Sequence, residues 1–198
     1  KGKTEYFNIP ASFDIETTSF SVTNFETGES MKAATMYIWQ LGINGAVIYG
    51  RTWEEFLEVL NQLVDYLELS IRRRLIIYVH NLGYEFQFIR RMFEWNKVFA
   101  IKQRRPVYAI CQGLEFRCSL FLSNYSLAYI GDNLLHKYPI QKLVGDLDYY
   151  KHRHSKTPLT QEELNYCIND VRVVMSYIQE KIELDGDITQ IPLTNTGY

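Results

Sequence analysis

The segment Leu75-Ile76-Ile77-Tyr78-Val79-His80-Asn81-Leu82-Gly83-Tyr84-Glu85 changes abruptly from apolar to polar residues. Its first five residues form a continuous apolar run of the kind that is buried on both faces of a sheet. Binding sites in α/β sheets lie at the ends of parallel strands, so the polar residues that follow are candidate site residues. The alternative is an ordinary strand-to-helix loop, in which Asn81 caps a short helix expected at residues 84–93.

Predicted strands and helices alternate on both sides of this segment. Strands are predicted at residues 12–15, 33–43, 46–49, 98–101, 107–111 and 114–118, with a hairpin turn at Asn44-Gly45. Helical spacing predicts helices at residues 52–68, at 126–138, and from a capping box at Thr160 and Glu163 onward. This order predicts an α/β fold with a sheet flanked by helices. Residues 136–158 are expected to be irregular, and residues 186–198 to be a linker or chain end.

Composition limits the class of protein. The chain has 198 residues, enough for one domain with a full core. Its net charge of −2 is unlike that of proteins that wrap duplex DNA, so contact with nucleic acid should be local, as with a polymer end in a cleft. Three cysteines without a CxxC pair argue against a disulfide framework or zinc ribbon and favour a cytoplasmic location. No apolar run approaches transmembrane length, so no membrane partner is expected. The chain begins at Lys1 rather than Met, so we expect a piece of a longer protein.

Two groups of acidic residues have the spacing of a metal site. Alternation along a strand places Asp14 and Glu16 on one face, where they form half a site for Mg²⁺ or Mn²⁺. The alternative is an exposed strand end with solvated carboxylates. Asp170 follows Tyr166 by one helical turn, so the two side chains share a face of the last helix. A tyrosine that simply packs at the helix surface would have the same spacing.

Three segments together resemble the exonuclease motifs of family B DNA polymerases, particularly the protein-primed branch of phages and linear plasmids. They are Asp14-Ile15-Glu16-Thr17-Thr18, Asn81-Leu82-Gly83-Tyr84-Glu85 and Tyr166-Cys167-Ile168-Asn169-Asp170, in the family's order. Supporting stretches are Phe116-Arg117-Cys118-Ser119-Leu120, Gly145-Asp146-Leu147-Asp148-Tyr149 and Ile191-Pro192-Leu193-Thr194-Asn195-Thr196-Gly197. The last of these resembles the junction that leads into the polymerase palm.

The resemblance implies a ribonuclease H-like fold of the DEDD exonuclease type, with a mixed sheet flanked by helices. Residues 1–190 would be the 3′→5′ exonuclease domain, and residues 191–198 a linker toward a palm domain that is absent here. The implied activity is removal of nucleotides from single-stranded DNA 3′ ends, the proofreading part of a DNA polymerase, with two Mg²⁺ or Mn²⁺ ions. The implied partners are the DNA end, the polymerase domain of the parent chain and a priming terminal protein.

The resemblance also implies roles for individual residues. The metal ligands would be Asp14, Glu16, Glu85 and Asp170, and Tyr166 would orient the attacking water. The residues that would contact the last nucleotides of the DNA are Thr17, His80, Asn81, Tyr84, Ser119, Leu120 and Tyr149. For each of these, core packing or loop capping is the alternative.

Three departures from the family pattern bear on activity. Glu85 stands where the family usually has Asp, Cys118 replaces another Asp, and Val144 replaces a catalytic Lys. Lys142 lies two residues away and is a candidate substitute, but in an extended segment it would point elsewhere. Two alternatives therefore stay open: a catalytically weakened module that binds single-stranded DNA or a primer end, and a DEDD nuclease that acts on RNA.

The remaining basic residues have simpler interpretations. His152 and His154 lie in a basic loop without a third ligand, so we do not expect a metal site there. Three arginine clusters, at residues 72–74, 90–91 and 104–105, are expected to be solvated surface. At most one of them is expected to contact the phosphates of DNA.

Overall fold

The computed structural model describes residues 2–145, 148 and 151–197 of the chain. The core is a mixed eight-stranded sheet with the strand order β4-β3-β2-β5-β8-β7-β6, and β1 pairs with β5. Its strands are β1 (Glu5–Tyr6), β2 (Ala11–Thr23), β3 (Ser30–Ile43), β4 (Ala46–Gly50), β5 (Arg73–Val79), β6 (Lys97–Lys102), β7 (Arg105–Cys111) and β8 (Leu114–Cys118). The central strands β2, β5 and β8 are parallel to one another, and the outer hairpins are antiparallel.

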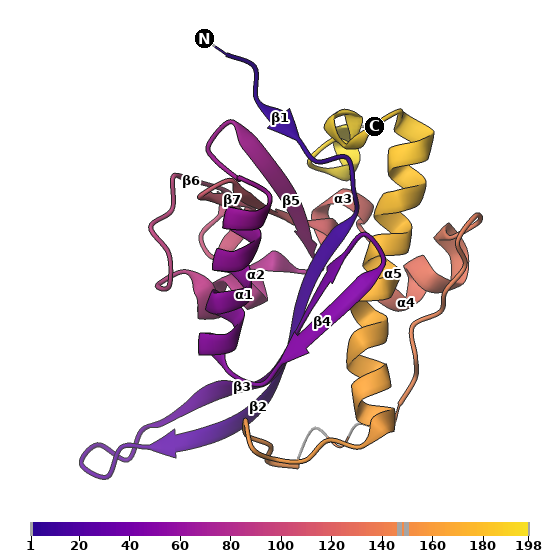
Figure 1. Ribbon diagram of the computed structural model, residues 1–198. Helices are drawn as coiled ribbons and strands as arrows, with labels where there is room; N and C mark the ends of the chain where they lie inside the picture. Colours follow the sequence, from indigo (N-terminus) through magenta and orange to yellow (C-terminus); the bar gives the residue numbers. More distant parts are fainter. Residues whose placement is uncertain (1, 146–147, 149–150, 198) are drawn as a thin grey trace.

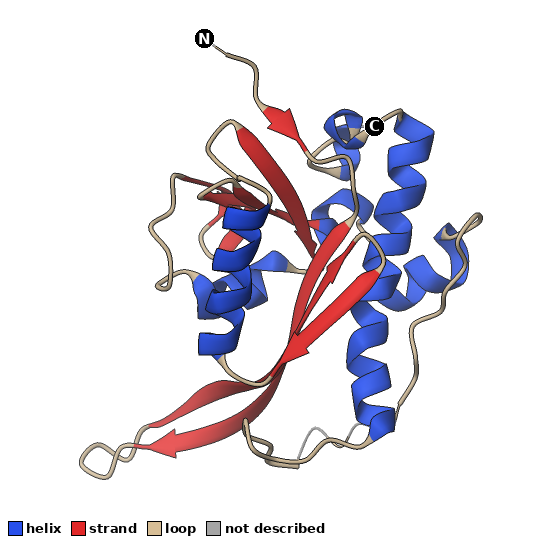
Figure 2. Cartoon of the chain, in the orientation of Figure 1, coloured by secondary structure: helices blue, strands red, loops and turns tan. Residues whose placement is uncertain are grey.

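Helices cover both faces of this sheet, as Figures 1 and 2 show. The helices α1 (Trp53–Tyr66) and α2 (Leu82–Ile89) lie on one side, and the long helix α5 (Gln161–Asp185) lies on the other. Short helical segments complete the fold: α3 (Ser119–Ser123), α4 (Leu127–Tyr129), the π-helical η1 (Ile130–Leu134), and the 3₁₀ turns η2 (Ile188–Gln190) and η3 (Asn195–Gly197). None of the helices in the described ranges is both long and apolar enough to cross a membrane.

The apolar run of β5 is buried on both faces, as its sequence predicts. Leu75 and Ile77 pack into the cluster beneath α1 and α2, whereas Ile76 and Tyr78 pack into the cluster beneath α5. All four side chains are at most 1% exposed. β5 therefore lies at the centre of the sheet, and its carboxyl end brings Asn81 and Glu85 to the middle of the molecule.

Local signals predicted several element boundaries correctly. A full capping box forms at the start of α1, because the Thr52 side chain accepts from Glu55 N and the Glu55 carboxylate accepts from Thr52 N. The Asn44-Gly45 turn has φ angles of 48° and 93°, the positive values that a tight two-residue hairpin requires. At the start of α5, only half of the predicted box forms: Thr160 caps Glu163 N, but the Glu163 carboxylate pairs with Arg153 at 3.3 Å.

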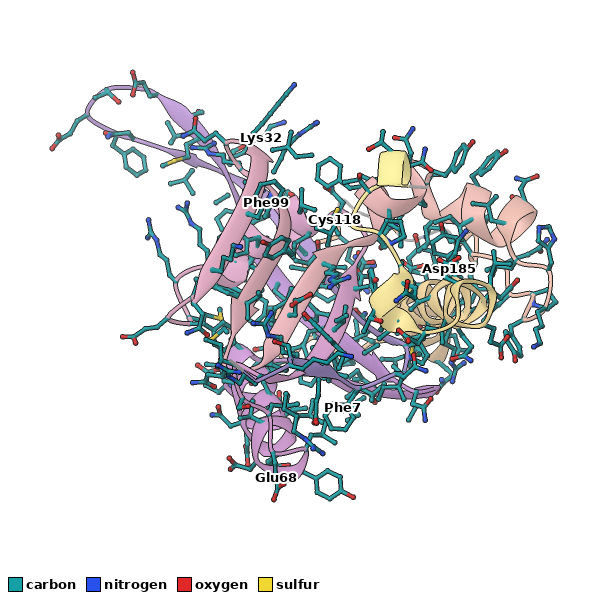
Figure 3. The ribbon with its side chains drawn as sticks, turned by 90° about the horizontal axis from the view of Figure 1, so that it is seen from above. Phe7, Lys32, Glu68, Phe99, Cys118 and Asp185 are labelled. Atoms are coloured by element: carbon teal, nitrogen blue, oxygen red, sulfur yellow. The ribbon has the colours of Figure 1, made fainter. Side chains whose placement is uncertain are left out.

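The prediction that the first strand ends at residue 15 is wrong. β2 continues to Thr23 and pairs with β3 from Ser30 onward, so that the two strands form an arm that projects beyond the sheet. Figure 3 shows this arm, with Lys32 on it, from above. Residues 17–23 are rich in β-branched side chains, which favour a strand once a partner strand is available. Asp14 and Glu16 therefore lie in the middle of a long strand rather than at an exposed end.

Two further predictions need correction. The helix expected at residues 126–138 is limited to α4 and η1, and residues 135–138 are not helical. The tail expected to be a linker packs against the body through η2, because Ile188 and Ile191 are apolar and bury themselves in the cluster beneath α5. The proposed domain boundary at residue 190 stays a prediction.

Candidate metal centre

Three carboxylates converge where β2 meets α5. Asp14, Glu16 and Asp170 each offer an oxygen, and these oxygens all lie within 4.8 Å of one another. In the strand register, Asp14 is opposite Gln40 and Glu16 is opposite Ile38. The period of two along β2 turns both acids toward α5, where Asp170 faces them. The structure thus brings the first and third acidic motifs together, as the sequence predicts.

Close packing of α5 on the sheet makes this convergence possible. Cys167 and Tyr166 of α5 pack against Tyr37 and Ile38 of β3. Further along the helix, Met175 lies over Gly42, where an added Cβ would be only 2.5 Å from the Met175 Cε atom. A larger residue at position 42 would have to displace the end of the flexible Met175 side chain.

Glu85 approaches the same site from the first turn of α2. Its side chain is buried, at 3% exposed, and it hydrogen-bonds the carboxyl group of Asp14. Two carboxyl groups can bond in this way only if they share a proton. The Glu85 Oε2 atom is buried and has no hydrogen-bond partner among the described residues. The longer side chain, in place of the usual Asp, thus still reaches the acid cluster.

The electrostatics of the cluster favour a bound cation. Burial, followed by repulsion from neighbouring acids, raises the pKa of Asp14 to about 7 and that of Glu16 to about 8. Burial raises the pKa of Asp170, and burial together with the charge of Asp14 raises that of Glu85 well above its usual value. A site with only carboxylate oxygens, one of them orphaned, fits the ligand preference of Mg²⁺ or Mn²⁺.

Lys142 is the cation that the structure does supply. Its Nζ atom lies 2.9 Å from the Tyr166 hydroxyl and 3.2 Å from Asp170 Oδ1. Of the two alternatives for Lys142, the structure thus shows the one in which the side chain points toward the acids. The amide of Asn169 donates to the Gln141 carbonyl at 2.8 Å, which ties the segment to α5 and turns Lys142 inward. Val144, at the position where the family usually has Lys, is 99% exposed.

The residues expected to contact DNA form two groups. Asn81, Tyr84 and Leu120 line one cavity of about 240 Å³, and the Thr17 Oγ1 atom lies 2.5 Å from the Tyr84 hydroxyl. These four side chains thus border the acid cluster on the α2 side. Asn81 is exposed and has a φ of 73°, so it starts α2 from a left-handed conformation without a side-chain cap.

The second group is less accessible. Ser119 is fully buried, and its hydroxyl oxygen lies 3.0 Å from His80 Nδ1. Burial lowers the pKa of His80 to about 4, so this ring is neutral at physiological pH. The pair lies at the end of β5, and its expected contact with DNA stays a prediction. Tyr149 lies outside the described residues.

Sequence reasoning missed Arg153. This residue is only 6% exposed. Its guanidinium lies over the Tyr37 ring and forms an ion pair with Glu163. Its backbone amide and carbonyl both hydrogen-bond the Thr18 hydroxyl. Arg153 thereby fixes the basic loop beside β2, and its charge lowers the pKa of Glu16. No local pattern distinguishes it from its solvated neighbours.

The raised pKa values predict how stability depends on pH without metal. A carboxyl whose pKa is higher in the folded state stabilises the fold fully below its unfolded value, near 4, and loses that contribution as pH rises through 7 to 8. We expect the metal-free protein to lose roughly 2–4 kcal/mol between pH 5 and pH 8, or a Tm decrease on the order of 10 °C. Thermal unfolding in EDTA measures this.

Bound metal should reverse the loss of stability at high pH. Because Mn²⁺ binds the ionised carboxylates, the Tm increase on adding Mn²⁺ should be larger at pH 8 than at pH 6. A Glu26→Gln variant, which changes an exposed carboxylate at the tip of the arm, should behave like the wild type. A metal-free Tm that stays level from pH 5 to pH 8 would contradict the buried acidic cluster.

Solved structures of Phi29 DNA polymerase have a similar fold. The chain is similar to Phi29 DNA polymerase in an orthorhombic crystal form, with a TM-score of 0.66, 18% identity and 96% of this chain covered. It is also similar to that polymerase complexed with primer-template DNA and incoming nucleotides (TM-score 0.64, 20% identity, 93% covered) and with single-stranded DNA (TM-score 0.63, 17% identity, 91% covered). This chain spans 32% of the length of those polymerase chains.

No protein-family model matches the sequence, and no curated protein matches it. At 17–20% identity, the structural likeness establishes a common fold. The mixed α/β sheet flanked by helices that the sequence predicts is thereby confirmed, and the chain shares the fold of part of Phi29 DNA polymerase.

Proposed function

We propose that this chain is a metal-dependent 3′→5′ exonuclease that removes nucleotides from single-stranded DNA ends, the proofreading part of a DNA polymerase. The observation that carries the proposal is the convergence of Asp14, Glu16 and Asp170, with Glu85 against Asp14, on a ribonuclease H-like fold. A nuclease of this type needs a dense carboxylate site, which is costly to bury for any purely structural reason.

The four carboxylates would hold two divalent ions, Mg²⁺ or Mn²⁺. When bound, such ions supply a nucleophilic water at neutral pH and stabilise the charge on the leaving 3′ oxygen. Asp14 lies within 4.8 Å of Glu16 and Asp170 and also interacts with Glu85, so it is the residue that would contact both ions.

Tyr166 and Lys142 would act beside the carboxylates. Lys142 donates to the Tyr166 oxygen at 2.9 Å, which directs the proton of that hydroxyl toward a different acceptor. The phenol can then donate to the attacking water or to a phosphate oxygen. Lys142 also lowers the pKa values of Asp14, Glu16 and Asp170, and so keeps them ionised at lower pH.

Asn81, Tyr84 and Leu120 would hold the last nucleotides of the strand. The asparagine amide is exposed for sugar or phosphate oxygens, and Tyr84 and Leu120 offer flat or apolar faces for bases. The Thr17 hydroxyl fixes the Tyr84 ring. The similarity to Phi29 DNA polymerase complexed with single-stranded DNA supports a single strand as the substrate.

The weakened-site alternative receives less support. It rested on Val144 and Glu85, but Lys142 supplies a cation near the site and Glu85 reaches Asp14. An RNA substrate would use the same acids, so substrate choice requires a direct assay.

The test is digestion of a 5′-labelled single-stranded DNA with Mn²⁺, beside an RNA of the same sequence and a blunt duplex. We expect a ladder that shortens from the 3′ end of the DNA, slower cleavage of the duplex, and none in EDTA. A ladder from RNA alone would establish the RNA nuclease instead. Binding of DNA without any cleavage in Mn²⁺ would favour the binding module.

A further inference from the structure

The turn between β6 and β7 lies directly against the start of α2. Gln103 and Arg104 form this turn, and Arg104 has a φ of 63°, a left-handed conformation that is uncommon for a residue with a side chain. An added Cβ at Gly83 would lie 2.9 Å from the Arg104 carbonyl oxygen. A glycine at position 83 therefore lets the turn approach the second acidic motif closely.

This contact brings Arg104 and Arg105 into the cavity that Asn81, Tyr84 and Leu120 line. The cavity has a volume of about 240 Å³, and its lining contains two guanidinium groups and no carboxylate. Both arginines are exposed, and neither side chain forms a hydrogen bond or an ion pair with another residue in the described part of the chain. Arginines without a carboxylate partner, held beside a cavity, are suited to bind phosphate.

Tyr84 connects the cavity to the acid cluster. Tyr84 belongs to the cavity, precedes Glu85 on α2, and contacts Thr17, which follows Glu16 on β2. A second cavity of about 460 Å³ shares Gly83, Gln87 and Arg104 with the first and is also lined by Arg90. A strand whose 3′ end lies at the acids would therefore meet apolar faces first and the two arginines next.

We propose that Arg104 and Arg105 form a phosphate-binding subsite for the single-stranded DNA upstream of the nucleotide that is removed. The subsite rests on the proposed function and deepens it. Phe121 joins Tyr84 and Leu120 as the apolar wall for bases, while the arginines hold the backbone. In a protein with a net charge of −2, such a local cation pair is what keeps a polyanion in place.

The variant that tests the subsite is Arg104→Asn combined with Arg105→Gln. Asparagine tolerates the left-handed conformation at position 104, so the turn keeps its shape while both charges are lost. The matched control is Arg91→Gln combined with Arg172→Gln, which removes two exposed arginines that do not line this cavity. Both double variants have the same net charge, so a difference between them reports position rather than total charge.

The first measurement is binding of a fluorescent 15-nucleotide oligo(dT) in Ca²⁺ at several salt concentrations. We expect the Kd of the subsite variant to rise by roughly tenfold or more, and that of the control to change little. Each lost phosphate contact should also reduce the slope of log K against log salt by about 0.7, so the pair should reduce it by about 1.4. Equal Kd values and slopes for the two double variants would overturn the proposal, as would a wild type that does not bind oligo(dT).

The second measurement separates this subsite from the cleavage chemistry. The p-nitrophenyl ester of thymidine 5′-monophosphate has no upstream nucleotides, so the subsite variant should hydrolyse it like the wild type in Mn²⁺. On oligo(dT), the KM of that variant should rise with little change in kcat. A wild type that binds oligo(dT) through these arginines but cleaves nothing would refute the exonuclease while supporting the subsite; equal loss on both substrates would refute the subsite.

Discussion

Asp14→Asn should abolish Mn²⁺-dependent cleavage of single-stranded DNA, with a loss of at least about 10³-fold in kcat/KM. Asp14 contacts Glu85 on one side and lies within 4.8 Å of Glu16 and Asp170 on the other, so a neutral amide removes a ligand from both halves of the site. The same substitution removes one charge from a buried group of acids. The metal-free variant should therefore be more stable than the wild type at pH 8.

The substitution should therefore lower activity and raise the stability of the metal-free protein. A residue that only supported the fold would lose activity and stability together when changed. The measurement pairs the DNA digestion assay with thermal unfolding in EDTA at pH 8, and Glu26→Gln serves as the control for loss of a solvated carboxylate. Retained cleavage in Asp14→Asn, or a lower metal-free Tm, would contradict the site described here.

Lys142→Met should lower kcat by about 10²-fold, because the substitution removes the positive charge that Asp170 and Tyr166 share. The charge of Lys142 lowers the pKa values of Asp14, Glu16 and Asp170. Without it these pKa values rise, so the acidic limb of the pH profile of kcat/KM should move to higher pH. Lys142→Arg keeps the charge and should retain part of the activity with an unshifted limb.

Val144→Ala provides the comparison within the same segment. Val144 is 99% exposed and contacts neither Tyr166 nor the acids in the described structure, so its loss should leave both kcat and the pH profile unchanged. If Lys142→Met lowered kcat without moving the acidic limb, Lys142 would be acting on Tyr166 alone. If it changed neither quantity, the contacts of Lys142 would have no part in catalysis.

Much of the fold follows from local sequence patterns. The apolar run of β5, the Thr52 capping box and the Asn44-Gly45 turn each depend on residues that are close together in the chain. The acidic motifs also carry their own periodicity: two residues apart on a strand, and one turn from Tyr166 on a helix. Such patterns are local, so they predicted which side chains would share a face without reference to the rest of the molecule.

Other features depend on partners that are distant in sequence. Residues 17–23 form a strand because residues 30–36 lie beside them, and Ile188 is buried because α5 passes over it. Lys142 enters the site because Asn169, on another element, holds the Gln141 carbonyl. Arg104 and Arg105 meet the second acidic motif because Gly83 lets a distant hairpin approach.

The sequence alone thus determined the class of fold, the main elements and the acids that a metal site would need, because periodicity and capping act within a few residues of the chain. Tertiary packing decided that Lys142 lies beside those acids, which of the expected DNA contacts are buried, and that Arg104 and Arg105 line the cavity. Those outcomes depend on burial, charge and close approach between segments far apart in sequence, and no local pattern records them.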